Sequence, residues 1–317
     1  MARLDITPLA NRQGIRIAGV TLAACADAGL RAELNALFEQ HGTLVFAGVE
    51  PTVAMHVALS EVFGPLKDHP SPAVPRVEGA PQGVIDMPRK VGEPGSIEVD
   101  GRELAAWLPW HFDHAYNNEL NRAGVLRAID IPPDGGRTGF VDGIALYEAL
   151  SPGLRAAIEG KDILYRMNVI MENFRFGRPE RYRVVAESLH AGAVMDAARD
   201  TPRAIHPAVW TRATGEKVLH ISPWMAEGIA GMENEEGDAL LDAVCREIHA
   251  HAERLSYFHE WSLTDMLIWD NWRVLHAVSG HDPRHFRRMQ RTTIKGDYGL
   301  GRFEGDGTGS KVLEMTF

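Results

Sequence analysis

The chain has 317 residues, of which 45% are hydrophobic, and its 43 acidic and 33 basic side chains give a formal net charge of −10. This composition is typical of a globular protein and excludes the disordered and collagen-like classes. The acidic balance disfavours nucleic acid and anionic membranes as partners, because both require a basic surface. A small-molecule substrate is the expected partner.

Cysteine usage and the N-terminus bear on the cellular compartment. Cys25 and Cys245 are the only cysteines, which is too few for a disulfide framework or a thiolate zinc site. No N-terminal segment has the charged and then apolar pattern of a signal peptide, and no apolar run approaches the roughly 20 residues that span a bilayer. We therefore expect a cytoplasmic protein. Homo-oligomerisation stays open, because no surface pattern favours a particular number of subunits.

Apolar spacing predicts a helix, a strand and a second helix near the N-terminus. Leucines and a phenylalanine recur at helical spacing over 27–42. The β-branched run over 43–46 predicts a buried strand, and a second helix is expected over 52–63. The stretch 66–106 is rich in proline and glycine, so it is expected to hold loops with one strand at most.

From residue 107 onward the pattern changes to short apolar runs bounded by turn residues, which predict strands. These strands are expected over 124–131, 163–171, 217–222 and 263–269, and helices over 144–160 and 236–254. No repeat or linker marks a boundary, so we expect one domain over 1–317. The arginine-rich stretch 173–203 is either a solvated surface excursion or a lid over a pocket.

A His-x-Asp fragment is the first candidate for chemistry. On a strand, His111 and Asp113 point to the same face while Phe112 is turned to the other. His114 would also face the other way if the strand continued, and a structural role is expected for it. The fragment alone is weak evidence, since such pairs occur by chance in many proteins.

A second fragment, Trp269 to His276, is the second candidate: its sequence predicts the end of a strand, then a turn, and then a histidine. Two histidines and one carboxylate leave three adjacent coordination positions free, which suits a non-haem iron(II) that activates dioxygen, whereas zinc prefers a more closed set. His281 is the alternative distal ligand, but its neighbours indicate a loop. Asp270 and Asn271 are expected to form the turn and to orient the imidazole.

An arginine cluster follows the distal histidine. A dicarboxylate that chelates iron through its 2-oxo acid end needs its other carboxylate neutralised, and a guanidinium does this with two parallel hydrogen bonds. Arg287, eleven residues after His276, is placed to do so.

Taken together, these motifs resemble the taurine dioxygenase / 2,4-dichlorophenoxyacetate dioxygenase family of Fe(II)- and 2-oxoglutarate-dependent oxygenases. The resemblance covers nearly the whole chain. Further similar stretches are Ile6-Thr7-Pro8-Leu9 with Gly14, Phe63-Gly64-Pro65-Leu66, Gly135-Gly136-Arg137-Thr138, the run 145–150, His206-Pro207 and Gly296-Asp297.

The resemblance implies a mainly β fold with flanking helices, a double-stranded β-helix or jelly roll of two packed antiparallel sheets. It implies His111, Asp113 and His276 as the iron ligands. It also matches Thr138 and Arg287 to the residues that bind 2-oxoglutarate.

Two further residues match positions near the family's substrate. Arg291 matches an arginine beside the substrate or the co-substrate, and Arg288 between the two arginines is expected to point away. His69 matches a region that lines the substrate site, with a solvated loop histidine as the alternative. The related iron halogenases replace the carboxylate ligand with a small residue, so the retained Asp113 favours hydroxylation.

We therefore expect an Fe(II)- and 2-oxoglutarate-dependent dioxygenase that hydroxylates a small, anionic organic substrate and releases succinate and carbon dioxide. The alternative is that the same chemistry serves desaturation, ring formation or oxidative bond cleavage in a biosynthetic pathway. A non-catalytic β-sandwich binding module and a zinc hydrolase are remote alternatives.

Overall fold

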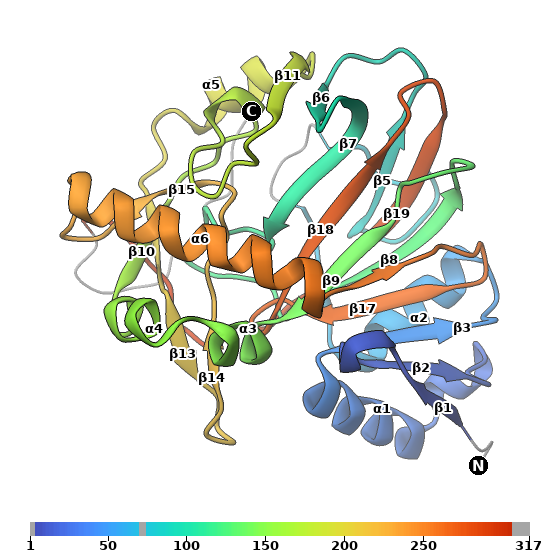
Figure 1. Cartoon of the computed structure of the whole chain (residues 1–317). Coiled ribbons are helices and arrows are strands. Elements are labelled where there is room, and N and C mark those ends of the chain that lie inside the picture. Colours follow the sequence, from blue (N-terminus) through green and yellow to red (C-terminus); the bar gives the residue numbers. More distant parts are fainter. Residues whose placement is uncertain (1–3, 70–73, 306–317) are drawn as a thin grey trace.

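Two β-sheets packed face to face form the centre of the computed structural model, which describes residues 4–69 and 74–305 (Figure 1). The larger, eight-stranded sheet has the order β1 (Asp5–Pro8), β2 (Ile15–Ala18), β3 (Thr43–Ala47), β17 (Met266–Asp270), β8 (Ala123–Asp130), β19 (Arg287–Ile294) and β4 (Leu66–Lys67), and β5 (Val84–Arg89) also pairs with β19. The six-stranded sheet has the order β11 (Tyr182–Ala186), β6 (Ser96–Val99), β7 (Arg102–His111), β18 (Val274–His281), β9 (Thr138–Asp142) and β16 (Tyr257–His259). This architecture confirms the predicted jelly roll with flanking helices.

Two small sheets and six α-helices surround this centre in the described part of the chain. The small sheets contain β15 (Ala226–Ile229), β10 (Asp162–Tyr165), β12 (Ala204–Pro207) and β20 (Arg302–Phe303), and the hairpin β13 (Val209–Thr211) and β14 (Lys217–Leu219). The helices are α1 (Ala28–His41), α2 (Val53–Phe63), α3 (Gly143–Ala149), α4 (Pro152–Ile158), α5 (Ala191–Ala198) and α6 (Glu235–Leu255). None of these helices is both long and apolar enough to cross a membrane.

Strand alternation divides the apolar side chains of the larger sheet between two cores. Val45 and Leu267 point inward and meet Phe140 of the smaller sheet. Leu44 and Phe46, the neighbours of Val45 in β3, point outward into a second cluster with α1 and α2. Figure 1 shows these two helices beside β1 to β3. The alternation therefore gives the larger sheet one core against the smaller sheet and another against the helices.

Local sequence signals explain the ends of the helices predicted near the N-terminus. The Asp27 side chain accepts a hydrogen bond from the Leu30 amide and so caps the start of α1. Gly42, with φ of 71°, ends the helix in the left-handed conformation that glycine adopts at low cost. Thr52 caps α2 in the same manner by accepting from the Met55 amide.

The stretch 66–106 is more regular than predicted, because it holds β4, β5, β6 and the start of β7. The strand β5 pairs with β19, and an isolated bridge joins Ile85 near its start to Arg76. Pro88 lies beyond that bridge, where β19 is the only described strand beside β5, and proline is tolerated at such an edge. The later part of β5, from Asp86 to Arg89, is only partly buried and lacks the apolar alternation that identifies strands from sequence.

The helix expected over 144–160 is two helices, α3 and α4, separated at Leu150 and Ser151. Proline disfavours the helical conformation of the residue before it, and Ser151 accordingly has ψ of 142°. Pro152 itself starts α4, where its missing N–H costs nothing.

Two further predictions are corrected by the structure, and a third stretch is more regular than its sequence indicates. The strand expected over 163–171 ends at Tyr165, and the one expected over 217–222 ends at Leu219. The stretch 173–203 holds both β11 and α5, and β11 extends the smaller sheet by pairing with β6. The short, half-exposed strand β11 has too few buried residues to show a clear pattern in the sequence.

Asp270 gives the fold a testable pH dependence. Burial raises the pKa of its carboxyl to about 6, against roughly 3.9 in an unfolded chain. Between these values the unfolded state has lost the proton and the folded state keeps it, so stability falls as pH rises from about 4 to about 6. The shift corresponds to about 3 kcal/mol.

We expect Asp270→Asn to unfold at a higher urea concentration than the wild type at pH 7.5 and at a similar one at pH 4. The asparagine oxygen can still accept from the Trp272 amide, as Asp270 does at 2.9 Å. Equal stability differences at the two pH values would contradict the assignment.

Candidate active site

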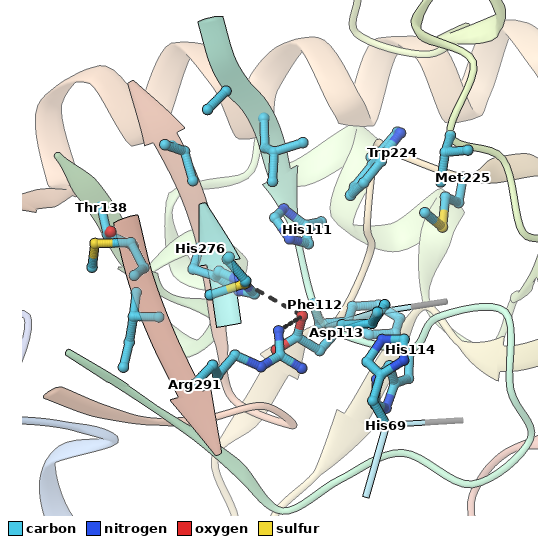
Figure 2. A pocket seen from close by; sticks show the side chains of 18 of the residues that line it. His69, His111, Phe112, Asp113, His114, Thr138, Trp224, Met225, His276 and Arg291 are labelled. Atoms are coloured by element: carbon cyan, nitrogen blue, oxygen red, sulfur yellow. Dashed lines mark hydrogen bonds and ion pairs between the residues drawn. The ribbon is translucent and has the colours of Figure 1, made fainter. Parts of the chain in front are cut away.

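A cavity of about 480 Å³ lies between the two main sheets (Figure 2). Its wall is mostly apolar: Leu126 and Met289 come from the larger sheet, Leu108 and Val278 from the smaller one, and Val194 from α5. Every site residue predicted from the sequence lines this cavity. These residues are His69, His111, Asp113, Thr138, His276, Arg287 and Arg291.

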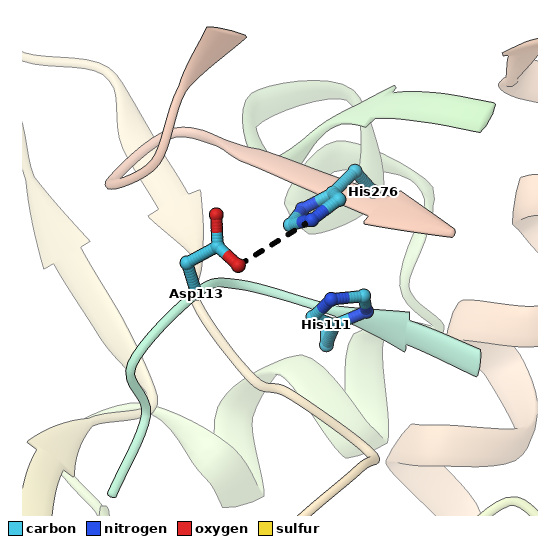
Figure 3. A group of neighbouring side chains, drawn as sticks. All are labelled: His111, Asp113 and His276. Carbon is cyan, nitrogen blue, oxygen red and sulfur yellow. Dashed lines mark ion pairs between the residues drawn. The ribbon is translucent and has the colours of Figure 1, made fainter. Parts of the chain in front are cut away.

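The pairing of β7 with β18 brings the two predicted histidine ligands together. In this antiparallel register His276 lies opposite His111, and their ring centroids are 4.0 Å apart. The strand β7 ends at His111, so Asp113 lies just beyond it, with its Oδ1 atom 3.7 Å from Nε2 of His276 (Figure 3). One ligand atom from each of the three side chains lies within 4.8 Å of the others.

Hydrogen bonds to the backbone orient these side chains. Nδ1 of His111 donates to the Pro109 carbonyl at 2.7 Å, which fixes the tautomer and leaves the Nε2 lone pair free. The Asn271 side chain accepts from the Asp113 amide at 2.7 Å and donates to the Asp113 carbonyl at 3.0 Å. The turn after β17 therefore fixes the segment that carries the carboxylate, whereas we expected from the sequence that Asn271 would orient the imidazole.

The electrostatics of the three side chains suit a divalent metal. Burial lowers the pKa of His111 and holds that of His276 well below its ordinary value, so both imidazoles are neutral at pH 7. Burial by itself would raise the pKa of Asp113, but the pKa is lowered, and the adjacent Arg291 guanidinium is the largest of the causes that lower it. The Oδ2 atom of Asp113 is buried without a hydrogen-bond partner among the described residues. Two neutral imidazoles and a carboxylate with a free oxygen are a fitting donor set for iron(II).

Arg287 is a buried cation without a carboxylate partner in the described part of the chain. It lies in β19 with 8% of its surface exposed, and its Nε donates to the Gly136 carbonyl at 3.3 Å. Burial lowers the pKa of this guanidinium to about 10, so it remains charged at pH 7. A buried charge is costly unless it is paired, and the guanidinium therefore suits a carboxylate that enters from outside.

Thr138 lies at the start of β9, opposite Val278 in the neighbouring β18. Its side chain is buried and lines the cavity, and its Oγ1 accepts a hydrogen bond from the Trp261 indole at 3.2 Å. The hydroxyl can still donate one hydrogen bond to a ligand oxygen.

Alternation along β19 separates the three clustered arginines. Arg287 and Arg291 line the cavity, whereas Arg288 points away and pairs with Asp86 at 2.8 Å, as predicted. Arg291 donates from Nη1 to Oδ1 of Asp113 at 2.8 Å and from Nη2 to Thr293 at 3.3 Å. This contact with Asp113, which the sequence did not predict, places Arg291 beside the ligand set.

Two histidine predictions are corrected. His281 was expected in a loop, but it ends β18, and its Nε2 donates to the His285 carbonyl at 3.2 Å, outside the ligand cluster. His114 was expected to face away from the site, but it is buried in the cavity wall. The reason is that β7 stops at His111, and His114 has a left-handed φ of 62° that redirects its side chain.

Sequence reasoning also missed Trp224 and Met225, which line the cavity. The Trp224 ring meets His111 edge-on, with ring centroids 5.1 Å apart. Both residues lie in a loop before β15, and no periodicity or spacing connects that loop with the ligands.

A His-Asp-His set with open coordination positions, enclosed by a jelly roll and adjoined by an unpaired arginine, defines the class of mononuclear non-haem iron oxygenases. Comparison of the sequence with family models makes the assignment specific. The model of the taurine catabolism dioxygenase TauD, TfdA family matches residues 5–293, and the chain belongs to this family. The protein is thus a 2-oxoglutarate-dependent dioxygenase, with Fe(II), 2-oxoglutarate and dioxygen as cofactor and co-substrates.

Named relatives extend over nearly the same length. Pentalenolactone F synthase of Streptomyces arenae is 25% identical over 299 residues, covering 92% of this chain and 95% of the relative. An (S)-phenoxypropionate/alpha-ketoglutarate-dioxygenase of Sphingobium herbicidovorans is 29% identical over 298 residues, with the same 92% and 95% coverage. The crystal structure of a taurine dioxygenase from Burkholderia xenovorans has the same fold, with a TM-score of 0.68, 24% identity, and coverage of 93% of this chain and 91% of that one.

The bridge from Asn271 to Asp113 gives a prediction for metal affinity. Asn271→Ala removes both hydrogen bonds to the Asp113 backbone, so we expect Co(II), as an oxygen-stable substitute for Fe(II), to bind about 10 to 100 times more weakly. Calorimetric titration at pH 7 measures the affinity.

Asn35→Ala is the matched control, because the Asn35 amide also donates to two backbone carbonyls, those of Arg31 at 2.8 Å and Val62 at 2.9 Å, far from the ligands in sequence. This variant should lower stability and leave Co(II) affinity unchanged. A similar loss of affinity in both variants would show that Asn271 acts through stability alone.

Proposed function

We propose that this dioxygenase hydroxylates a C–H bond of a small organic substrate and releases succinate and carbon dioxide. One observation carries the proposal: the buried, unpaired Arg287 shares a cavity with the cluster of His111, Asp113 and His276. A metal site alone suits many reactions, whereas a metal site with a dedicated carboxylate-binding cation suits a chelating dicarboxylate.

Each residue has a separate role in this proposal. His111, Asp113 and His276 hold the iron, which when bound supplies the activation of dioxygen. Arg287 binds the far carboxylate of 2-oxoglutarate through two parallel hydrogen bonds, and Thr138 donates to the same carboxylate. The apolar cavity wall excludes water, which strengthens these charge interactions.

The overall reaction balances with one dioxygen per turnover. Loss of carbon dioxide from 2-oxoglutarate is a two-electron oxidation, and replacement of C–H by C–OH is another. One oxygen atom therefore enters succinate and the other enters the product. The protein contributes geometry and charge, while the chemistry belongs to the metal and the co-substrate.

We further propose that the substrate combines an apolar body with an anionic group. The mostly apolar wall supports the first part, and the second is supported by two basic side chains in that wall, His69 and Arg291, of which Arg291 also pairs with Asp113. The Sphingobium herbicidovorans relative is named for (S)-phenoxypropionate, a molecule of this kind.

A biosynthetic role is the second candidate, because the Streptomyces arenae relative is named a synthase. In that case the same site would carry out desaturation, ring formation or oxidative cleavage. The mass of the product separates the two: hydroxylation adds one oxygen atom, and desaturation removes two hydrogen atoms.

We also propose that the stretch 173–203 covers the cavity. A second, separate proposal is that the enzyme is cytoplasmic. Val194 of α5 already lines the cavity, which supports the first part, and the unpaired, buried Cys25 and Cys245 support the second.

A direct test of the co-substrate role uses Arg287→Gln. We expect the dissociation constant for 2-oxoglutarate, measured by anaerobic visible titration of the Fe(II) protein, to rise about 100-fold, since a buried charged pair contributes roughly 3 kcal/mol. Arg288→Gln is the control, because Arg288 lies on the opposite face of β19 and pairs with Asp86. Unchanged affinity in Arg287→Gln would contradict the proposed role.

Turnover with a panel of apolar acids under isotopically labelled dioxygen tests the reaction itself. We expect at least one acid to stimulate succinate formation and to gain one labelled oxygen atom. His276→Ala should form neither product. A mass decrease of two would instead favour the biosynthetic candidate, and succinate formation that no acid stimulates would argue against both.

A further inference from the structure

His114 occupies an unusual backbone position in the cavity wall. The chain leaves β7 at His111, and His114 has φ of 62°, with its carbonyl accepting from the Asn117 amide at 2.8 Å. Only six non-glycine residues of the described chain have positive φ, and three of them, Ala106, His114 and Met225, line this cavity. Such conformations cost free energy and persist where the surrounding structure fixes them, which occurs most often at functional sites.

The His114 ring is buried and lacks hydrogen-bond partners. The residue is 6% exposed, and neither Nδ1 nor Nε2 has a partner in the described part of the chain. Its ring instead lies edge-on to His69 and to Tyr116, with centroids 5.7 Å and 5.9 Å away. A buried polar atom without a partner is rare in proteins and requires an explanation.

His220 shows the alternative for a buried histidine without hydrogen bonds. Its ring is stacked between Phe112 and Trp272, with centroids 3.9 Å and 4.9 Å away, and it does not line the cavity. Stacking on both faces accounts for His220. His114 has no such stacking partner in the described structure and lies in the wall of a cavity, so a ligand is the expected partner.

The surroundings of His114 define the group that it would bind. Figure 2 shows His114 and His69 together, next to the Asp113 carboxylate. Tyr116, beside His114, packs in a cluster with Met167, Val194 and Met225, which also line the cavity. A ligand here would place one polar group on the imidazole and an apolar body against the neighbouring side chains.

We propose that His114 determines substrate specificity by donating a hydrogen bond from its ring to a carboxylate or carbonyl oxygen of the substrate. This inference rests on the proposed function and deepens it, because it names the residue that binds the polar end of the substrate. A substrate that is hydrogen-bonded to His114 has its polar end beside Asp113 and its apolar body along Met167, Val194 and Met225. His114 is thus a substrate-binding residue, and the metal ligands keep their separate role.

The test measures binding, so it does not depend on turnover. The full-length protein is loaded with Zn(II) and 2-oxoglutarate and titrated with (S)-2-phenoxypropionate, cyclohexanecarboxylate and octanoate. Each acid is paired with the counterpart that lacks the carboxyl group: ethoxybenzene, cyclohexane and heptane. We expect at least one acid to bind at least 10 times more tightly than its counterpart. On binding, the ¹⁵N resonances of the His114 ring should shift, which a purely structural histidine would not show.

Two substitutions of His114 separate hydrogen bonding from shape. His114→Phe keeps an aromatic ring but removes both nitrogens, and should weaken acid binding at least 10-fold without changing binding of the counterpart. His114→Asn keeps a donor and suits a left-handed backbone, and should bind the acid within about 3-fold of the wild type. His251→Phe, a change to a partly exposed histidine of α6 outside the cavity, is the matched control and should match the wild type. Thermal melting of each variant confirms folding.

Acid binding that is unchanged in His114→Phe would overturn the proposal, and so would three acids that bind no better than their counterparts. The anaerobic titration of the Fe(II) protein with 2-oxoglutarate distinguishes this failure from failure of the proposed function. If 2-oxoglutarate binds with the expected dependence on Arg287, only the role of His114 is lost. If it does not, the proposed function is also lost.

Discussion

The antiparallel pairing of β7 with β18 is the constraint on which the site depends. Its register sets His276 opposite His111, and a shift by one residue would turn one imidazole to the other face of the sheet. The register is enforced by burial, since Leu275 and Ala277, which flank His276, belong to the core on the opposite face. Asn271 then ties the segment after β7 to the turn before β18. Metal-ligand geometry is thus a consequence of core packing and one buried amide.

Two arginines of β19, Arg287 and Arg291, line the cavity, but they differ in whether their charge is already neutralised by a carboxylate of the protein. Arg291 is paired with Asp113, so its charge lowers the pKa of a carboxylate that must stay ionised in a buried position. Arg287 has only the Gly136 carbonyl as a partner in the described structure, so its charge remains available to a ligand. Because alternate residues of a strand share a face, one strand supplies both functions, while Arg288 between them pairs with Asp86 outside the cavity.

Features that cost free energy gather around this cavity. The free carboxylate oxygen of Asp113, the unpaired charge of Arg287 and the left-handed backbone of His114 all occur there. The two cores beside it, with side chains such as Leu44 and Phe140, are packed and apolar. This division is expected if the cores stabilise the fold and the cavity is adapted to bind ligands.

The sequence by itself indicated the fold class and the three metal ligands through its resemblance to a known family, whose motifs keep their order along the chain. It indicated the helices with clear caps through local spacing. It could not determine that β7 stops at His111, that His114 therefore enters the cavity, or that Arg291 contacts Asp113. It also missed most of the short strands β4 to β6 and the break at Pro152. Only the tertiary structure decided these points, because strand ends and side-chain partners are set by contacts between segments far apart in the chain.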